Sequence, residues 1–211
     1  MKAHAGMMEV VDLMCVRGTR RLFQNLSFAQ SAGELLYVHG PNGSGKTTLL
    51  RTLCGLALPE SGEVRWRGQN IRGLGEEYYS EMAYVGHLNG VKDELTAFEN
   101  LQMAGRLSGV ENCDELAVEA LQRLELSACA ELPGKALSQG QKRRVALARL
   151  LMVQRTLWIM DEPFNALDIK AVAMIQDILI EHLDNGGMAV LTTHQEVEIT
   201  AHRARHIRLG S

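Results

Sequence analysis

The stretch from Gly40 to Thr48, GPNGSGKTT, constrains this chain more than any other. Its spacing is that of a phosphate-binding loop, in which glycines let the backbone turn sharply and direct its N–H groups at phosphate oxygens. The apolar run Leu35–Val38 precedes the loop and is typical of a short buried strand. Apolar residues at helical spacing follow it as far as Gly55. We therefore predict that the loop connects a strand to a helix, as the motif requires.

The residue types in this phosphate loop (Gly40–Thr48) suit a nucleotide. Lys46 supplies a mobile positive charge for the β- and γ-phosphates, and Thr47 supplies a hydroxyl for Mg²⁺. The helix that begins near Lys46 directs the positive end of its dipole at the same anion. A glycine-rich turn that binds nothing is the alternative, and the matches further along the chain argue against it. The predicted nucleotide-binding residues are Gly40, Pro41, Asn42, Gly43, Ser44, Gly45, Lys46, Thr47 and Thr48.

Composition indicates one large domain with its own hydrophobic core. The chain has 211 residues, 46% of them hydrophobic, and a formal net charge of -3. That charge gives no general reason to bind nucleic acid. Three local basic clusters are interpreted by default as solvated surface: Arg17, Arg20 and Arg21; Lys142, Arg143 and Arg144; and Arg203, Arg205 and Arg208.

The cysteine pattern and the N-terminus favour a protein that stays in the cytoplasm. None of the four cysteines forms a C-x-x-C pair, so reduced thiols are the simplest account. Residues 1–6 lack the apolar core of a signal peptide, and no apolar run approaches the ~20 residues that span a bilayer. Any membrane attachment is therefore expected to come through a partner.

The sequence predicts mainly β-strands in the first third of the chain. Short apolar or alternating runs bounded by glycines predict strands at 9–13, 26–29, 35–38 and 62–68, and a further strand at 82–85. Thr96 and Glu99 have the spacing of a capping box and predict a helix to about Leu107. A second helix is expected at about 114–124.

The remainder alternates helices with buried strands. Ser138 and Gln141 form another capping box, which opens a helix. The apolar runs 157–160 and 188–192 suit strands buried on both faces, and an amphipathic helix, 171–183, separates them. Such alternation implies a mostly parallel sheet with right-handed crossovers.

Three polar residues end two of these strands. Asp161 lies where a buried strand should meet the phosphate loop, which suits a carboxylate that holds Mg²⁺. Glu162 follows it and can polarise an attacking water. His194 ends the 188–192 run on the same edge and can position that water against the γ-phosphate. Alone, each would be read as ordinary surface or structural polarity. Beside the phosphate loop, the functional reading is favoured.

Taken together, these motifs resemble the ATP-binding-cassette (ABC) ATPase family. The matching pieces come in family order and cover nearly the whole chain: the phosphate loop, residues 137–149 with the Leu-Ser-x-Gly-Gln pattern, residues 157–163, residues 165–168 and residues 193–194. The resemblance implies an α/β fold: a phosphate-loop NTPase core with a mostly parallel sheet, an antiparallel β edge subdomain and an inserted helical subdomain. It implies one cassette over 1–211, with the core at about 1–87 and 137–211 and the helical subdomain at about 88–136.

The same resemblance implies a head-to-tail dimer of two copies. Each ATP, bound with Mg²⁺, would lie between the phosphate loop of one subunit and the signature segment (Ser138–Gln141) of the other, where Ser138, Gly140 and Gln141 would meet it. A capped helix N-terminus offers a hydroxyl, backbone N–H groups and a dipole to a γ-phosphate, which agrees with this role. Asp168 would belong to the loop that links the two sites.

Three positions depart from the common family pattern. Gln139 replaces a glycine of the signature segment, while Gly140, where close backbone approach is needed, is kept. Arg17 aligns with the aromatic residue that usually stacks on adenine; a guanidinium can stack on a base, with Leu22 or Phe23 beside it. His87 replaces a glutamine and can approach Mg²⁺ or the water, or be a satisfied loop histidine.

Three stretches are similar to the haem-exporter ATPases of bacterial cytochrome c maturation: residues 84–101, 20–23 and 143–150. That similarity implies a peripheral ATPase on the cytoplasmic face of the inner membrane, working with integral membrane subunits to drive haem export or release of a haem-loaded chaperone. No haem-ligating motif is present in the sequence, so direct haem binding is not expected.

Other classes stay open at this point. The motifs bind ATP rather than cargo, so the ATPase of another transporter fits them equally well. A soluble ABC protein acting on ribosomes or DNA usually carries two cassettes or a long coiled coil, and neither feature is found in this sequence. A binding-only module is disfavoured because Glu162 and His194 are both present.

Overall fold

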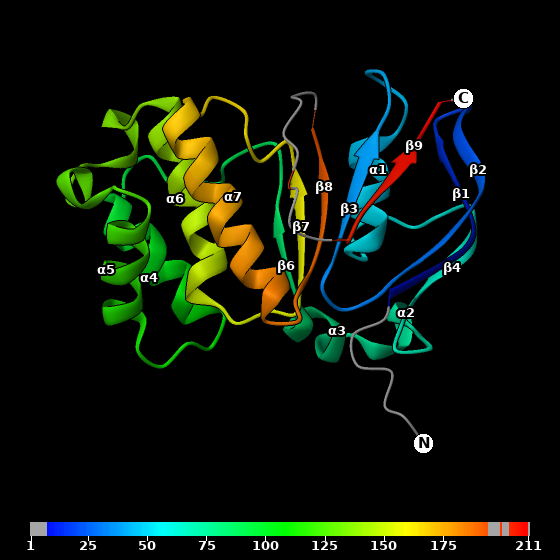
Figure 1. The fold of residues 1–211 in the computed structure, drawn as a ribbon, viewed down its shortest axis with the longest axis horizontal. Helices are drawn as coiled ribbons and strands as arrows, with labels where there is room; N and C mark the ends of the chain where they lie inside the picture. The colour runs from blue at the N-terminus through cyan, green and yellow to red at the C-terminus, as the bar shows by residue number, and fades with distance from the viewer. Residues whose placement is uncertain (1–7, 194–198, 200–202, 211) are drawn as a thin grey trace. The chain divides into compact units, whose positions relative to one another are not determined.

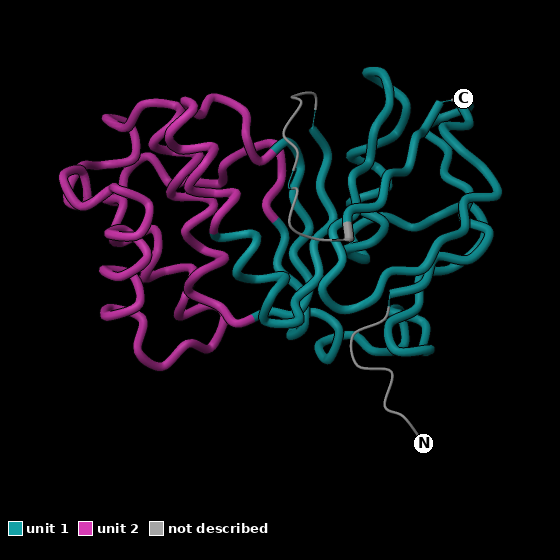
Figure 2. Tube along the Cα trace, in the orientation of Figure 1, with its two compact units in different colours: residues 1–84, 155–162, 178–211 teal, residues 85–154, 163–177 magenta. Residues whose placement is uncertain are grey.

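The computed structural model describes residues 8–193, 199 and 203–210. The chain forms two compact units, shown in Figure 2: unit 1 comprises residues 1–84, 155–162 and 178–211, and unit 2 comprises residues 85–154 and 163–177. Unit 1 holds the two sheets, and unit 2 is mainly helical. The predicted insert, 88–136, lies within unit 2, which also contains the signature segment.

A four-stranded antiparallel sheet forms the N-terminal part of unit 1 (Figure 1). Its strand order is β2-β1-β4-β5, and every adjacent pair is antiparallel. This confirms the predicted antiparallel edge. The strands are β1 (Met8–Arg17), β2 (Arg20–Gln30), β4 (Ser61–Trp66) and β5 (Gln69–Asn70).

The second sheet has the order β6-β7-β8-β3-β9, and its β7/β8, β8/β3 and β3/β9 pairs are parallel. Parallel strands end at the same edge, so this topology brings the ends of β3, β7 and β8 together (Figure 1). The sequence predicted four of these strands and missed β9. The strands are β3 (Glu34–His39), β6 (Met82–Val85), β7 (Leu157–Asp161), β8 (Met188–Thr192) and β9 (Arg203–Arg208).

The core of unit 1 is built around α1 (Lys46–Leu53). Its Leu49, Leu50 and Leu53 are fully buried with apolar side chains of both sheets. Burying side chains of this size contributes roughly 1.5–3 kcal/mol each. The helix is therefore held firmly, and with it the end of the phosphate loop. Two short helices, α2 (Ile71–Leu74) and α3 (Glu76–Glu81), follow the antiparallel sheet.

The main helices of unit 2 begin at the predicted caps. Thr96 caps α4 (Ala97–Leu107) and Ser138 caps α6 (Gln139–Met152), each in a complete capping box. These two helices and α5 (Cys113–Arg123) pack against one another, with Leu101, Leu121 and Val145 buried. The 3-10 turns are Ser127–Cys129 and Gly134–Ala136, and α7 (Ile169–Asp184) continues from unit 2 into unit 1. Within the described ranges, no helix has both the length and the apolarity of a membrane span.

His182, near the end of α7, is expected to make the stability of unit 1 sensitive to acid. Its ring stacks on the Trp158 indole, with centroids 3.8 Å apart and planes at 5°, and its Nε2 lies 3.2 Å from the Met188 carbonyl oxygen. A Cβ atom at Gly187 would fall 2.2 Å from this ring, so a glycine is required there. Burial lowers the pKa of His182 below its ordinary 6.5, and hydrogen bonds to the Met188 and Thr156 backbone offset part of the shift.

A lowered histidine pKa means that the unfolded chain takes up this proton first as the pH falls. The free energy of unfolding should therefore decrease as the pH drops below about 6.5, by up to ~1.4 kcal/mol for each unit of pKa shift. His182→Phe keeps an aromatic ring on Trp158 but cannot take up a proton. Urea unfolding at pH 7.5 and 5.5 should show a smaller loss for the variant than for the wild type, and equal losses would contradict this assignment.

Candidate nucleotide site

The phosphate loop connects β3 to α1, as the sequence predicted. Lys46, the first residue of α1, is only 8% exposed, and its Nζ donates to the Gly40 and Pro41 carbonyl oxygens at 2.8 and 3.4 Å. Ser44 Oγ is buried without a hydrogen-bond partner. A buried hydroxyl normally has a partner, so this orphan donor fits a loop that takes a ligand oxygen.

Two glycines of the loop combine a positive φ with close neighbours. Gly40 has φ 151°, and a Cβ there would lie 2.5 Å from Ser44 Oγ and 2.7 Å from the Leu209 carbonyl oxygen. Gly45, the N-cap of α1, has φ 102°, and its Cβ would touch Leu22 and the Phe23 ring at 3.0–3.1 Å. Other residue types rarely adopt these φ values. The absence of side chains at these glycines leaves the backbone N–H groups of the loop uncovered next to the N-terminus of α1.

The two residues that follow β9, Leu209 and Gly210, contact the phosphate loop and the end of β3. The Leu209 N–H donates to the His39 carbonyl at 2.9 Å, and Gly210 packs on Pro41 and Ser44. His39 ends β3, and its Nε2 lies 2.9 Å from Nδ1 of His206 on β9. Burial, followed by the nearby positive groups, lowers the pKa of His39 below its ordinary value.

Asp161 joins the phosphate loop at the end of β7. Its Oδ2 accepts a hydrogen bond from the Thr47 hydroxyl at 2.7 Å, and its Oδ1 accepts one from the Thr192 hydroxyl at 2.7 Å. The strand register pairs Asp161 with Thr192, which explains the second contact. The carboxylate is 2% exposed. Carboxylate and hydroxyl oxygens at this spacing fit a hard cation such as Mg²⁺.

Glu162 follows with an unusual backbone. Its φ is 51°, in the left-handed region that non-glycine residues seldom occupy, and its N–H donates to Thr192 Oγ1 at 2.9 Å. Such strain is often kept at functional sites. Thr192 therefore holds both acidic residues, a role that sequence reasoning missed. The signal was present, since Thr192 ends an apolar strand on the same sheet edge.

The loop, Glu162 and the end of β1 surround one cleft of about 170 Å³ in unit 1. Arg17 and Leu22 contribute to its wall, and the stacking of Arg17 on adenine stays a prediction. Phe23, the other suggested neighbour, points instead into the core. The cleft is lined by Arg17, Leu22, Asn42, Gly43, Gly45, Lys46, Thr47, Thr48 and Glu162.

The signature segment opens α6 in unit 2. Ser138 Oγ accepts from the Gln141 N–H at 3.2 Å, and Gln141 Oε1 accepts from the Ser138 N–H at 2.8 Å. A Cβ at Gly140 would lie 2.7 Å from the Ala166 carbonyl oxygen, so this position needs a glycine for close backbone approach. The reciprocal cap leaves the Ser138 hydroxyl hydrogen available to a ligand.

The remaining predicted residues fall in different places. Asp168 is exposed and accepts from the Ala171 N–H at 2.8 Å, so it caps α7. His87 is exposed in the segment after β6. His194 lies outside the described residues, and its role stays a prediction.

The basic run on α6 corrects one sequence interpretation. Arg143 is only 3% exposed, and Lys142 pairs with Asp93 at 2.7 Å, so this cluster is not a solvated surface. Both side chains bind a segment that is distant in sequence. Arg143 donates to the Gly86 carbonyl oxygen, and Lys142 donates to the Asp93 carboxylate.

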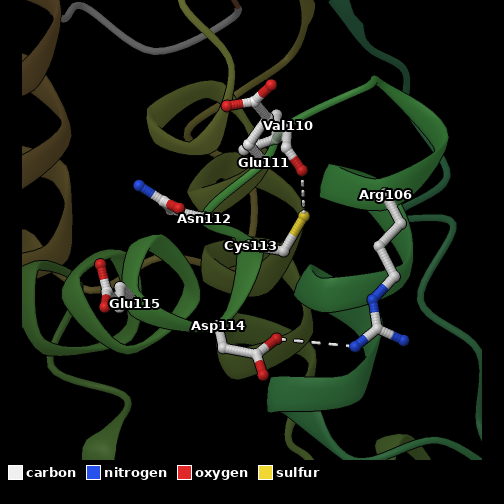
Figure 3. A pocket seen from close by; sticks show the side chains of 7 residues that line it. All are labelled: Arg106, Val110, Glu111, Asn112, Cys113, Asp114 and Glu115. Carbon is white, nitrogen blue, oxygen red and sulfur yellow. Dashed lines mark hydrogen bonds and ion pairs between the residues drawn. The ribbon is translucent and has the colours of Figure 1, made fainter.

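A larger hollow of about 350 Å³ opens at the start of α5 in unit 2 (Figure 3). The Cys113 thiol donates to the Val110 carbonyl at 2.9 Å, and Arg106 pairs with Asp114 at 3.6 Å. Most of its charged lining is acidic, which disfavours a phosphate. It contains none of the predicted site residues.

Comparison with known proteins decides the family. The protein-family model described as ABC transporter matches residues 23–165. The chain belongs to the ABC transporter family. Among solved structures of this family, one described as the ATP-binding subunit of an ABC transporter aligns with TM-score 0.81 and 26% identity, over 89% of this chain and 79% of that chain. A putative ABC transporter ATP-binding protein from Pyrococcus furiosus has the same fold, with TM-score 0.83, 24% identity and coverage of 96% and 97%.

Relatives within the ABC transporter family match along nearly the whole chain. The cytochrome c biogenesis ATP-binding export protein CcmA of Nitrosospira multiformis is 52% identical over 96% of this chain and 98% of its own length. The proteins of that name from Nitrosomonas europaea and Pseudomonas aeruginosa are 51% and 46% identical, each over 97% of this chain and over 96% and 100% of their own lengths.

Proposed function

We propose that this chain is the ATP-hydrolysing subunit of a membrane ABC transporter that serves cytochrome c maturation, by haem export or by release of a haem-loaded chaperone. One observation carries the motor function: Lys46, Thr47, Asp161 and Glu162 converge at the end of the parallel sheet. The cargo rests on the similarity to the cytochrome c biogenesis ATP-binding export proteins. The chain would work peripherally, at the cytoplasmic face of the inner membrane, on integral membrane subunits.

In this proposal the phosphate loop binds the nucleotide. The backbone N–H groups of the loop and the Lys46 ammonium bind the β- and γ-phosphates in place of the loop carbonyls that Lys46 now contacts. The Thr47 and Asp161 oxygens would hold Mg²⁺, which when bound neutralises phosphate charge. Arg17 and Leu22 would cover the base. The proposal assigns no haem-binding role to this chain.

Glu162 would act as the general base. Its carboxylate accepts a proton from a water as the water oxygen bonds to the γ-phosphorus, and the bond from that phosphorus to the bridging oxygen breaks to release ADP. The peptide hydrogen bond to Thr192 fixes the backbone from which this side chain projects. His194 would orient the same water, and His87 would approach it from its loop.

A second copy of the chain would complete each site. Ser138, Gly140 and Gln141 of the partner copy would meet the γ-phosphate with a hydroxyl, N–H groups and a helix dipole. Asp168 would lie in the loop that connects the two ATP sites. Each copy would therefore contribute to both bound nucleotides.

Capture from membranes tests the partners and the cargo. A tagged Glu162→Gln variant should retain ATP, and its membranes should be solubilised in detergent with ATP before the copurifying proteins are identified by mass spectrometry. Lys46→Ala, which should not hold ATP, is the matched control. Polytopic subunits together with cytochrome c maturation factors are expected. A different permease would keep the motor and discard the cargo, whereas ribosomal or DNA-bound partners would overturn the proposal.

A further inference from the structure

Arg143, on the second turn of α6, contacts two separate segments of unit 2. Its Nε donates to the Pro163 carbonyl at 3.1 Å, and its Nη1 donates to the Gly86 carbonyl at 2.8 Å and to the Asn89 Oδ1 at 3.2 Å. The side chain is 3% exposed. Among polar side chains of the described ranges, few are so thoroughly buried, and burying a charge is costly unless its hydrogen bonds are made.

Two neighbours on α6 fasten the same loop, which we define as Gly86–Asp93. Arg149 donates to the Gly90 carbonyl at 2.7 Å, and Lys142 binds the Asp93 carboxylate at 2.7 Å. The loop that carries His87 is thus tied to one helix along its length. Arg143 differs from the other two because it also donates to Pro163. Pro163 follows α6 in the chain, whereas the loop precedes α6.

The positions of these contacts suggest a role in turnover. Pro163 is buried and directly follows Glu162. Because the proline ring fixes φ, a displacement of Pro163 is expected to displace the Glu162 backbone as well. Gly86 and Asn89 flank His87. Arg143 lies five residues after Ser138 on one continuous helix. A single guanidinium on the helix of the signature segment therefore contacts the residue that follows Glu162 and the chain on both sides of His87.

We infer that Arg143 is a positioning residue, which sets Glu162 through the Pro163 carbonyl and keeps the His87 loop in register with the signature helix. The inference rests on the proposed function, because it assigns Glu162 to hydrolysis and Ser138 to the nucleotide of the partner copy. In that arrangement, α6 contacts one ATP and Glu162 acts on the other. Arg143 would couple a movement of α6 to the position of the Glu162 carboxylate.

The test compares the same substitution at adjacent residues. Arg143→Lys keeps the positive charge, but an ammonium cannot reproduce the planar fork that reaches several carbonyl groups. Arg144→Lys is the control, since Arg144 donates to the Leu124 and Glu125 carbonyls and touches neither the loop nor Pro163 through a described contact. ATP affinity and turnover should be measured on the full chain together with its captured membrane subunits.

Arg143→Lys should lower kcat by at least about tenfold while the Kd for ATP stays within about twofold, because small displacements of a catalytic group are costly. Arg144→Lys should hydrolyse ATP within about twofold of the wild type. In single-turnover assays, Arg143→Lys should add no further loss to Glu162→Gln, because a residue that acts through another is not additive with it.

Three results would overturn the inference: wild-type turnover in Arg143→Lys, an equal loss in Arg144→Lys, or multiplicative losses in the double variant with Glu162→Gln. Circular dichroism should show the same helix content in all variants, and a fall in kcat that only follows the folded fraction would count against a positioning role. If the wild-type complex itself hydrolyses no ATP, the proposed function fails, and the inference falls with it.

Discussion

Glu162→Gln should slow ATP hydrolysis by at least about a hundredfold while ATP remains bound. A positioned general base contributes roughly 10²–10⁴-fold, and the glutamine amide has almost the same shape but cannot accept the proton. The phosphate loop, which provides most of the predicted binding contacts, is untouched by the change. Single-turnover hydrolysis with radiolabelled ATP would measure the rate, and size-exclusion chromatography with ATP would measure whether two copies stay together.

Glu125→Gln offers a control in the same chain. Glu125 also has a positive φ, 52°, but its carboxylate pairs with Lys170 in unit 2. This variant should hydrolyse ATP at the wild-type rate. Normal turnover in Glu162→Gln, or a variant that remains a monomer at saturating ATP, would remove Glu162 from the role of base.

Lys46→Ala should weaken ATP binding by on the order of a hundredfold, about 2.7 kcal/mol. The Lys46 ammonium is held against the phosphate-loop carbonyls by α1, so it needs little reorganisation to meet phosphate oxygens. Charge-assisted hydrogen bonds are the strong ones, and the lost charge cannot be replaced by water at a site this enclosed. Isothermal titration calorimetry with ATP and Mg²⁺ would measure the change.

Lys135→Ala removes an exposed lysine that pairs with Glu94 at 3.6 Å, and it should bind ATP like the wild type. Circular dichroism of both variants separates lost binding from lost folding. An unchanged Kd in Lys46→Ala would refute the assignment of the phosphate loop.

Local sequence signals predicted most of the fold because they act over short distances. The capping boxes at Thr96 and Ser138 begin helices at those residues, since each cap needs only its own first turn. The apolar run before Asp161 became a fully buried strand, as continuous apolarity indicates. The short helices α2 and α3 were missed because four and six residues hold too little periodicity to detect.

The parts that escaped prediction depend on partners distant in sequence. Arg143 looks like a surface charge in the run Lys142–Arg144, and only its contacts 20 and 57 residues away explain its burial. Strand β9 has arginines at three of its six positions and lacks an apolar run, and it forms because β3 offers it a free edge. Thr192 is a common strand-ending residue until the register places it beside Asp161. Apart from the strand end at Thr192, long-range pairing of this kind has no local signal.

The packing of Gly210 has a practical consequence for anyone who handles this chain. A Cβ at Gly210 would lie 3.2 Å from that of Ser44 and 3.5 Å from the Pro41 ring, so polypeptide fused after it would start beside the phosphate loop. Affinity tags, fluorescent labels and surface-immobilisation linkers attached there risk changing the very binding they are meant to report.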